Sequence, residues 1–403
     1  MRIHIHRGQN QIGGSIIEIA TDTTKILLDV GAELDDDGSH PLPDVQGLFD
    51  SAGYDAIFIS HYHGDHVGLA YRTHKDIPVY IGEAGYNVLR VSDNYKKKQT
   101  FMPKGFLRSK QPVSIGDIKV TPYLCDHSAF DSYMLFCEAE GETILYTGDF
   151  RSNGRKSFDA LLRILPKNVD KLLCEGTTLS RNNYKCVTEK ELENSAVALF
   201  RKTSGPVFIL QSTMNIDRIV TMYRATKRSS RIFLEDVYMA DIASVAGKNI
   251  PNPKFEDVYA FITSPSKYSS LVKYERKAGK LFISKKAFVM CIRTSMLSYL
   301  KSLEKMMSFE NGVLVYSFWS GYRETESMTD FLSECEKMGL SVVSLHTSGH
   351  ADEDAIRKLI KTVNPKEVIP VHTENAQRLN EIASECLQTH SESLDNNGAA
   401  EKS

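Results

Sequence analysis

The stretch FISHYHGDHVG, residues 58–68, places three histidines and an aspartate within six positions, directly after a short apolar run. His61 and His63 are two residues apart, so in an extended segment their side chains point the same way and can bind one ion. Asp65 and His66 follow Gly64, where the chain can bend and present a second pair elsewhere. One tetrahedral zinc ion cannot easily take four ligands from six consecutive residues, so the spacing favours two ions that share the loop. A proton relay and chance are the alternatives.

The remaining ligands should then come from distant segments, and candidates follow other predicted strands. His127 follows the run IKVTPYL, Asp149 ends TILYTGD, and His372 ends VIPVH. The Asp149 carboxylate could bridge both ions. Asp29, at the end of KILLD, is better suited to orienting a ligand histidine than to binding metal itself. The pattern therefore requires a fold in which the ends of distant strands converge.

The order of predicted elements indicates two domains. Short strands with turns and a few helices predict a layered α/β domain over residues 1–187. From 188 to 344 strands and helices alternate regularly, starting with a capping-box pattern at Thr188 and Glu191, which predicts an inserted α/β domain with a mostly parallel sheet. Residues 345–388 return to strand, loop and helix and complete the first domain. The polar segment 389–403 predicts a disordered tail.

Composition narrows the function classes. The net charge of −2 excludes a global basic field, so a polyanion would have to meet a local patch. The segments 95–110 and 267–288 are basic with interleaved aromatics, which suits phosphate contact and base stacking, although a solvated surface explains each equally well. Seven scattered cysteines without a C-x-x-C pair favour a reducing cytoplasm. The sequence MRIHIHRGQNQ has no apolar signal region, and no membrane span is predicted.

The ordered motifs resemble those of the metallo-β-lactamase superfamily, a four-layer αββα fold. The later motifs EGTT, SGHA and PVHTE resemble its β-CASP branch, which cuts nucleic acids and carries an inserted α/β domain. Within that branch the chain is most similar to ribonuclease J-like enzymes, over residues 8–380. Full-length bacterial ribonuclease J has a further C-terminal domain, and we expect this chain to lack it because it stops about thirty residues after His372. The oligomeric state therefore cannot be transferred, although oligomerisation is possible.

The resemblance implies a dinuclear zinc site, with manganese as the alternative metal, and specific roles for its residues. Asp149 would bridge the ions together with a water or hydroxide. His350 of SGHA would protonate the leaving 3′ oxygen and Glu175 would orient it, while Asp65 would serve both catalysis and metal binding. The first zinc would take His61, His63 and His127, and the second Asp65, His66 and His372.

Further residues bear on the substrate. The resemblance implies that His346 and Ser348 grip a substrate phosphate, and that Asn215 and Arg218 face the 5′ end of the substrate, although Arg218 could be a solvated helix charge. Histidine at position 372 favours RNA over DNA. We therefore expect a cytoplasmic ribonuclease that acts on single-stranded RNA as a 5′-to-3′ exonuclease, an endonuclease or both. A DNA nuclease or small-molecule phosphodiesterase using the same site, and a non-catalytic RNA-binding or scaffold protein, are the alternatives.

Overall fold

A computed structural model describes residues 1–34, 36, 39–181 and 186–400, with side chains to residue 388. The chain forms two compact units. The first comprises residues 1–89, 98–186 and 349–403, and the second comprises residues 90–97 and 187–348. The sequence predicted the insert at 188–344 and gave no sign that residues 90–97 join it. Among the described helices, none is both long and apolar enough to cross a membrane.

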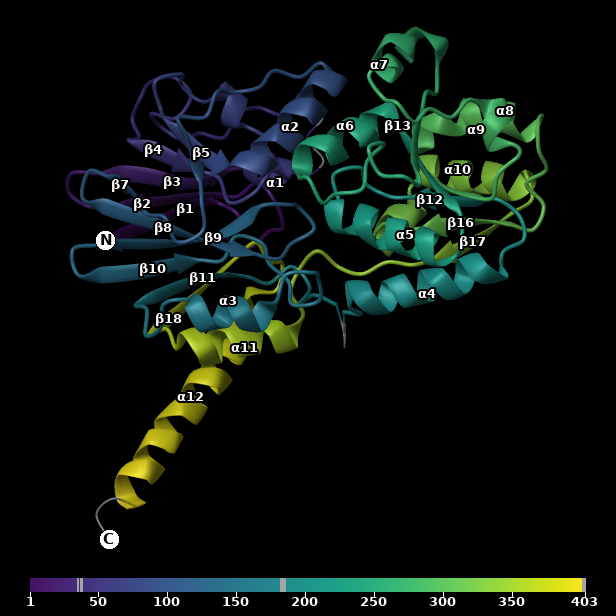
Figure 1. Ribbon diagram of the computed structural model, residues 1–403. Coiled ribbons are helices and arrows are strands. Elements are labelled where there is room, and N and C mark those ends of the chain that lie inside the picture. Colours follow the sequence, from purple (N-terminus) through teal and green to yellow (C-terminus); the bar gives the residue numbers. More distant parts are fainter. Residues whose placement is uncertain (35, 37–38, 182–185, 401–403) are drawn as a thin grey trace. The chain divides into compact units, whose positions relative to one another are not determined.

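The first unit contains two six-stranded sheets (Figure 1). In the first sheet the three N-terminal strands are antiparallel and the other pairings are parallel. Its strands lie in sequence order: β1 (Arg2–Arg7), β2 (Ile16–Ala20), β3 (Lys25–Val30), β4 (Ala56–Phe58), β5 (Val79–Gly82) and β6 (Gly105–Leu107).

The second sheet joins segments from both sides of the insert. The late strand β18 (Glu367–Val371) pairs in parallel with β11 (Lys171–Glu175), so residues about two hundred positions apart become neighbours. β11 is also parallel to the next strand, and the rest of the sheet is antiparallel. After β18 and β11 the order is β10 (Glu142–Tyr146), β9 (Ser132–Ala139), β8 (Ile118–Cys125) and β7 (Val113–Ile115).

The alternation of apolar side chains along the strands builds four layers. Ile26 and Leu28 of β3 face the core between the sheets, together with Ile144 of β10. Leu27 of β3 faces the opposite way and packs with residues of α1 and α2, whereas Leu145 of β10 packs with α3, α11 and α12. This confirms the predicted αββα sandwich. The helices are α1 (Gly64–Val67), α2 (Glu83–Lys96), α3 (Phe158–Ile164), α11 (Glu353–Val363) and α12 (Ala376–Ala400), with a 3₁₀ turn η1 at Ala70–Arg72.

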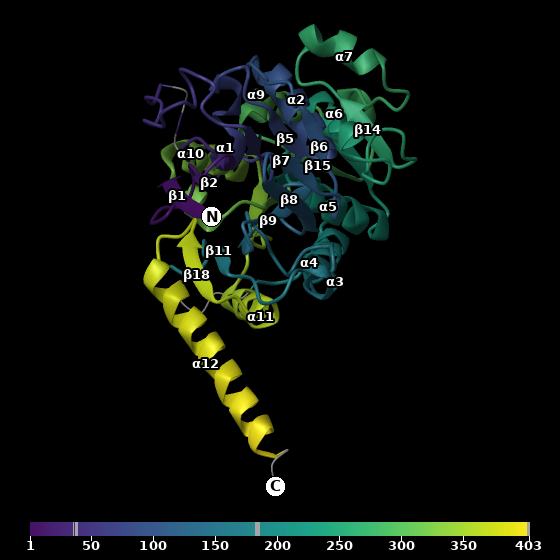
Figure 2. The same ribbon diagram turned by 90° about the vertical axis from the view of Figure 1, so that its left-hand side faces the viewer.

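The last helix extends beyond its packed part. Leu379, Ile382 and Cys386 of α12 are buried against the outer face of the second sheet. The helical backbone then continues to Ala400 (Figure 2). This differs from the disordered tail predicted from residue 389. The segment is polar but contains no proline, so the backbone can continue the hydrogen-bonded ladder begun by the packed turns. Residues 401–403 lie outside the described part of the chain.

The second unit is built on one six-stranded, wholly parallel sheet. Its strand order is β14 (Val258–Phe261), β13 (Ile232–Asp236), β15 (Phe288–Ile292), β12 (Val207–Leu210), β16 (Gly312–Tyr316) and β17 (Leu340–Ser344). Buried apolar runs in these strands fit a sheet covered on both faces. The helices are α4 (Glu189–Lys202), α5 (Ile216–Arg228), α6 (Val237–Ala246), α7 (Tyr268–Val272), α8 (Lys280–Ile283), α9 (Leu297–Glu304) and α10 (Glu326–Lys337), with 3₁₀ turns η2 (Pro265–Lys267), η3 (Thr294–Met296) and η4 (Ser320–Glu324).

The sequence signals at the start of the insert correspond to real contacts. The hydroxyl of Thr188 accepts a hydrogen bond from the backbone N–H of Glu191, and the Glu191 carboxylate accepts one from the Thr188 backbone N–H. This is the predicted capping box. At the second helix, the Asn215 side chain accepts from the Arg218 N–H and caps α5.

Glu235 on β13 is a buried carboxyl group without a hydrogen-bond partner among the described residues. Burial, with the adjacent Asp236 carboxylate, raises its pKa well above the usual value. Because the pKa is higher in the folded state than in the unfolded one, the associated stability is fully present below the unfolded pKa. It is lost as the pH rises towards the folded pKa.

We therefore expect Glu235→Gln to stabilise the protein at neutral pH, with a gain that shrinks towards pH 4. Unfolding midpoints measured in denaturant across this pH range provide the check. The exposed Glu256→Gln is the matched control and should leave the profile unchanged. A gain that is independent of pH would contradict the assignment.

Candidate metal centre

The predicted ligands gather at one end of the two sheets of the first unit. Asp29 lies near the end of β3, and His61 and His63 lie in the loop after β4. Asp65 and His66 belong to α1, which follows immediately. The other residues come from the second sheet, at the ends of four strands: His127 after β8, Asp149 after β10, Glu175 at the end of β11 and His372 after β18.

The first group of ligand atoms comprises His61, His63 and His127, whose nitrogens lie within 4.8 Å of one another. His127 Nε2 is 3.1 Å from His63 Nδ1. Tetrahedral ligands at a zinc–nitrogen distance of about 2.05 Å are separated by roughly 3.3 Å, so this spacing suits a common ion. His61 Nε2 is buried and has no hydrogen-bond partner among the described residues.

The second group comprises Asp65, His66, Asp149 and His372. His372 Nε2 is 3.1 Å from Asp65 Oδ2, and His66 Nε2 is 3.2 Å from Asp149 Oδ2. The same Asp149 oxygen is 3.7 Å from His61 Nε2 and 3.8 Å from His127 Nε2. One carboxylate therefore faces both groups, as a bridging ligand would.

The outer ring nitrogens indicate which atoms face the centre. His127 Nδ1 donates to the Gly349 carbonyl over 2.5 Å, and His66 Nδ1 donates to Asp29 over 2.7 Å. With Nδ1 protonated, each ring presents a lone pair at Nε2. The lone pair of His66 then faces the carboxylate oxygen of Asp149, and neither oxygen of Asp149 has a hydrogen-bond partner among the described residues. Lone pairs this close repel unless a cation lies between them, so the donor set fits bound metal.

The pKa values of the three histidines in the first group also fit a bound metal ion. Burial lowers the pKa of His61 and of His127 well below the usual value, and neighbouring imidazoles add to the effect. Burial also lowers the pKa of His63 to about 4. These rings are therefore neutral at physiological pH, which is the form that binds metal.

In the second group, acidic neighbours control the titration of His66. Burial alone acts to lower the pKa of His66, but Asp149, Asp29 and Asp65 together outweigh it and raise that pKa well above the usual value. A positive charge is thus strongly favoured at this position. A metal ion supplies such a charge without a proton.

His350 and Glu175 lie at the edge of the centre. His350 Nδ1 is 3.2 Å from Glu175 Oε2 and 3.6 Å from Asp149 Oδ2. The Glu175 carboxylate is fixed by the backbone N–H groups of Phe150, at 2.9 Å, and Thr177, at 3.3 Å. Although burial acts to lower the pKa of His350, Glu175 and Asp149 raise it to about 9. The His350 side chain is 21% exposed, whereas Glu175 is fully buried, so the imidazole lies on the accessible side.

The Asp29 carboxylate accepts several hydrogen bonds next to the candidate ligands, as expected for a residue that orients a histidine. Its carboxylate accepts from His66 Nδ1, from the Ser60 backbone N–H at 2.6 Å and from the Ser60 hydroxyl at 2.7 Å. The Tyr146 hydroxyl of β10 also donates to it, at 2.7 Å. Ser60 Oγ lies 3.0 Å from His61 Nδ1. The sequence gave no reason to select Ser60 or Tyr146 in advance, although Ser60 directly precedes the first histidine.

Asp126 and Arg151 form a second support that sequence reasoning missed. Both are buried, and Arg151 Nε donates to Asp126 Oδ1 over 2.6 Å. The Arg151 backbone N–H also donates to the Asp126 carbonyl over 2.8 Å. Each residue lies within two positions of a candidate ligand, His127 or Asp149. The pair thus holds together the segments that follow β8 and β10, which are separated in the sheet by β9.

The backbone at the site is constrained. Asp29 and His372 both adopt left-handed conformations, with φ of 62° and 49°, which are uncommon for residues other than glycine. The His372 N–H donates to the Gly8 carbonyl, which helps to hold this conformation. At Gly31 a Cβ atom would lie 1.8 Å from the Asp65 carbonyl oxygen. The close approach of the 61–66 loop to β3 therefore requires glycine there.

The four predicted substrate-binding residues all belong to the second unit. His346 Nδ1 lies 3.4 Å from the Ser317 carbonyl oxygen, and Ser348 is buried. Asn215 caps α5, as described above. Arg218 is not the solvated helix charge considered as its alternative: its guanidinium is fully buried, pairs with Glu189 at 3.2 Å and donates to Ser317 and to the Thr347 carbonyl. Its contact with the substrate stays a prediction. A helix-period pattern could not distinguish this buried pair from a solvated charge.

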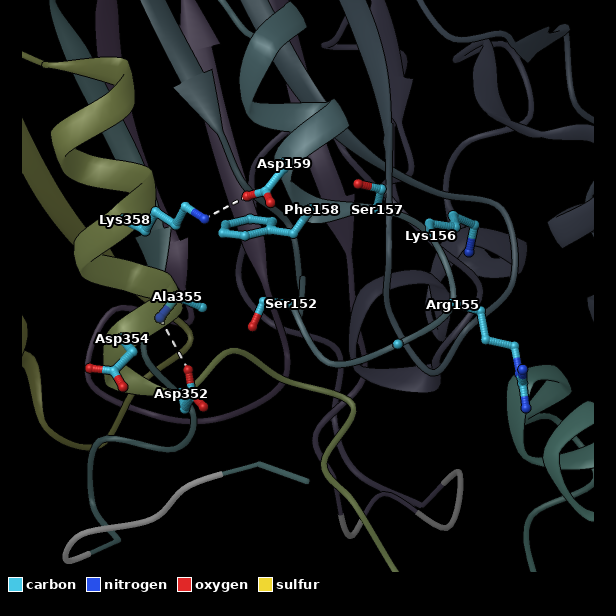
Figure 3. Close-up of a pocket in the computed structure, with 11 residues that line it drawn as sticks. Ser152, Arg155, Lys156, Ser157, Phe158, Asp159, Asp352, Asp354, Ala355 and Lys358 are labelled. Atoms are coloured by element: carbon cyan, nitrogen blue, oxygen red, sulfur yellow. Dashed lines mark hydrogen bonds and ion pairs between the residues drawn. The ribbon is translucent and has the colours of Figure 1, made fainter. Parts of the chain in front are cut away.

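A cavity of about 470 Å³ in the first unit is lined by residues from two segments, 152–159 and 352–358, which follow Asp149 and His350 in the sequence (Figure 3). Lys358 is paired with Asp159, and Asp352 caps the Ala355 N–H of α11. The three cationic residues of the lining are matched by three carboxylates, so the charge of this cavity gives no preference for phosphate. Its charged lining residues are Arg155, Lys156, Lys358, Asp159, Asp352 and Asp354.

Comparison with known proteins agrees with this geometry. Residues 337–385 match the family described as a Zn-dependent metallo-hydrolase RNA specificity domain. The chain is 26% identical to Probable RNase MJ4 of Methanocaldococcus jannaschii, over 91% of this chain and 92% of that protein. It is 22% identical to Ribonuclease J of Mycoplasma pneumoniae, over 96% of this chain and 70% of the relative.

A solved structure shares the fold. The crystal structure of a protein of unknown function from Enterococcus faecalis V583 superposes with a TM-score of 0.78, at 20% identity, over 93% of this chain and 94% of the other. The αββα sandwich with an α/β insert is the architecture of metallo-β-lactamase-fold hydrolases of the β-CASP type. Over most of its length the chain is therefore similar to ribonuclease J-like proteins, and residues 337–385 match the metallo-hydrolase RNA specificity domain.

Asp29→Asn should weaken metal binding by about ten- to a hundredfold, because the amide cannot accept all four hydrogen bonds that orient His66 and the 60–61 loop. Competition titrations with a chromophoric zinc chelator measure the affinity. Asp22→Asn, which changes an exposed carboxylate of the same unit, is the control. Equal affinity in the two variants would contradict the role of Asp29.

Arg218→Met should lower the free energy of unfolding by about 3–5 kcal/mol, since it leaves the Glu189 carboxylate buried without its cation. The double variant Arg218→Met/Glu189→Leu should regain most of that loss. Denaturant unfolding measures both. If Arg218→Met instead weakened substrate binding without destabilising the protein, the guanidinium would reach the substrate after all.

Proposed function

We propose that the chain is a metal-dependent ribonuclease that hydrolyses RNA phosphodiester bonds at the centre described above. The observation that carries the proposal is the convergence of imidazole nitrogens and carboxylate oxygens from both sheets on one buried site, where the oxygens of Asp149 have no hydrogen-bond partner among the described residues. The family description and the ribonuclease names of the relatives support RNA as the substrate class.

Two divalent ions, zinc or alternatively manganese, would be held as the two groups indicate. His61, His63 and His127 would hold one ion, Asp65, His66 and His372 the other, and Asp149 would contact both. When bound, such ions polarise the phosphodiester and make water a stronger nucleophile at neutral pH. Asp29 keeps His66 in the tautomer that presents Nε2 to the centre.

The protein side chains at the edge of the site would handle the leaving group. Glu175 is fixed by two backbone N–H groups and holds His350 through Nδ1, so Nε2 is the ring nitrogen on the far side from Glu175. From there His350 would donate a proton to the departing 3′ oxygen, which leaves as a hydroxyl. Because the His350 side chain is partly exposed while the rest of the cluster is buried, the RNA strand would enter on this side. His346 and Ser348 would contact a substrate phosphate.

Changing His350 to Ala should abolish RNA cleavage while metal content and RNA binding stay close to those of the wild type. Cleavage of a labelled RNA, metal analysis and filter binding give the three readouts. His74→Ala, a partly exposed histidine of the same unit, should have no effect. Loss of metal from His350→Ala would show that the residue is a ligand rather than the acid.

Metal removal provides a separate test. Chelation should abolish cleavage, and zinc or manganese should restore it, with two ions bound per chain after loading. Single-stranded RNA, duplex RNA and single-stranded DNA of equal sequence should be compared in the restored enzyme. We expect single-stranded RNA to be cut fastest. Faster cleavage of DNA would favour the alternative nuclease, and one ion per chain would contradict the dinuclear site.

The mode of cleavage can be read from the same reactions. Product sizes followed over time on 5′-monophosphate, 5′-triphosphate and 5′-hydroxyl RNA distinguish stepwise removal of nucleotides from internal cuts. A 5′-to-3′ exonuclease, an endonuclease or an enzyme with both modes is compatible with the proposal.

A further inference from the structure

Positive charge is concentrated in one surface segment of the second unit, residues 264–287, which we call the basic lobe. It holds seven lysines and arginines and a single carboxylate, Glu275, and so carries a net charge of +6. Since the whole chain has a net charge of −2, the remainder carries −2 − 6 = −8. Such segregation, rather than the net charge of the chain, is what attracts a polyanion.

The basic lobe is anchored to the sheet. The Ala260 N–H of β14 donates to the Arg276 carbonyl over 2.9 Å, and the Ala278 N–H donates back to the Ala260 carbonyl over 2.9 Å. Leu271 and Tyr274 pack into a small apolar cluster with residues of α6 and β14. The backbone between the cations is therefore fixed, so a ligand would lose less entropy on binding there than on a free tail.

Three of the seven cations are already engaged. Lys273 pairs with Asp241 at 2.6 Å, Lys280 donates to the Ser302 hydroxyl at 2.5 Å, and Lys267 contacts the Tyr95 hydroxyl and ring. The other four make no ion pair within the described part of the chain. Lys286 lies over the Phe282 ring, 5.5 Å from its centroid, but an aromatic ring does not neutralise its charge, so the charge of all four is available to a ligand. The four are Arg276, Lys277, Lys285 and Lys286, of which three are exposed lysines and Arg276 is half-buried.

Exposed apolar side chains accompany these charges. Tyr268 is 62% exposed at the start of α7, a helix that projects from the edge of the unit in both views (Figures 1 and 2). Leu281 of α8 is 63% exposed. An exposed tyrosine ring among cations is the combination that single-stranded nucleic acids use, with stacking for the bases and cations for the backbone.

We propose that the basic lobe is an RNA-binding surface that contacts nucleotides of the substrate strand other than those held at the metal centre. The proposal rests on the proposed ribonuclease function and adds a second binding surface to it. Arg276, Lys277, Lys285 and Lys286 would contact successive phosphates, and Tyr268 would stack on a base. The charge-balanced cavity of Figure 3 has no such excess of cations.

A membrane surface fits these features less well than RNA. Insertion into the headgroup region uses an amphipathic helix with a continuous apolar face. Here α7 has five residues and α8 has four, and they are separated by an irregular segment. Isolated cations on a rigid loop suit the point charges of a polynucleotide backbone better.

The test removes the four available cations and keeps the rest of the unit. In the His350→Ala background, which keeps the RNA intact, all four are changed to Gln. The matched control changes Lys202, Arg224, Lys248 and Lys305 to Gln, which are four exposed cations on other elements of the same unit and alter the net charge equally. Binding is measured as a function of salt with RNAs of about 30 and about 5 nucleotides.

We expect the lobe variant to bind the long RNA about tenfold more weakly at low salt, with a salt slope lower by about 3, and the control to lose much less. Binding of the short RNA should be unchanged. Tyr268→Ser should weaken binding of the long RNA about fivefold or more, whereas Tyr268→Phe should retain it. With His350 restored, cleavage of the short RNA should match that of the wild type.

Equal affinity of the lobe variant and the control for the long RNA would overturn the lobe and leave the ribonuclease function standing. If the wild type neither binds nor cleaves RNA, both the proposed role of the lobe and the ribonuclease function are wrong. Vesicles containing anionic phosphatidylserine serve as a further probe. Lobe-dependent binding to these vesicles without lobe-dependent RNA binding would assign the surface to membranes instead.

Discussion

The Asp29 carboxylate is the contact on which the centre depends. It extends from β3 of the first sheet and accepts hydrogen bonds from Ser60, His66 and Tyr146, the last of which belongs to the second sheet. A buried carboxylate is costly unless such donors satisfy it. The four hydrogen bonds to Asp29, two of them from Ser60, therefore join the two sheets, fix the histidine loop and set the tautomer of the His66 ring. The interactions that stabilise the sandwich therefore also preorganise the site.

The sequence predicted the fold and the candidate site best where metal-binding residue types directly follow strands with a clear apolar pattern. Alternating apolar residues in strands such as 25–30 and 142–146 predicted which faces are buried, and those faces form the layers of the sandwich. The candidate ligands could be selected because His127, Asp149 and His372 each follow an apolar strand. A hydrophilic, metal-type residue at that position has no packing role that competes with the functional one.

Other features could not be read from the sequence because they depend on long-range partners. Arg218 follows a helix cap and fits an exposed position as well as a buried one, and only the distant Glu189 and Ser317 decide between them. Tyr146 looks like any strand tyrosine until Asp29 is placed beside it. Residues 90–97 continue a single helix, α2, so no change in local pattern marks their transfer to the second unit.

The order of the ligands along the chain has a consequence for synthesis. The insert separates Glu175 from His350 and His372, and the strand that positions His372, β18, reaches its neighbour β11 only after the intervening residues have been made. A nascent chain that has emerged as far as the end of the insert already holds the first histidine loop but has neither of the two late histidines. A ribosome-bound fragment would thus be unable to assemble the complete centre close to the messenger that encodes it, and activity would begin only after the late segment has docked.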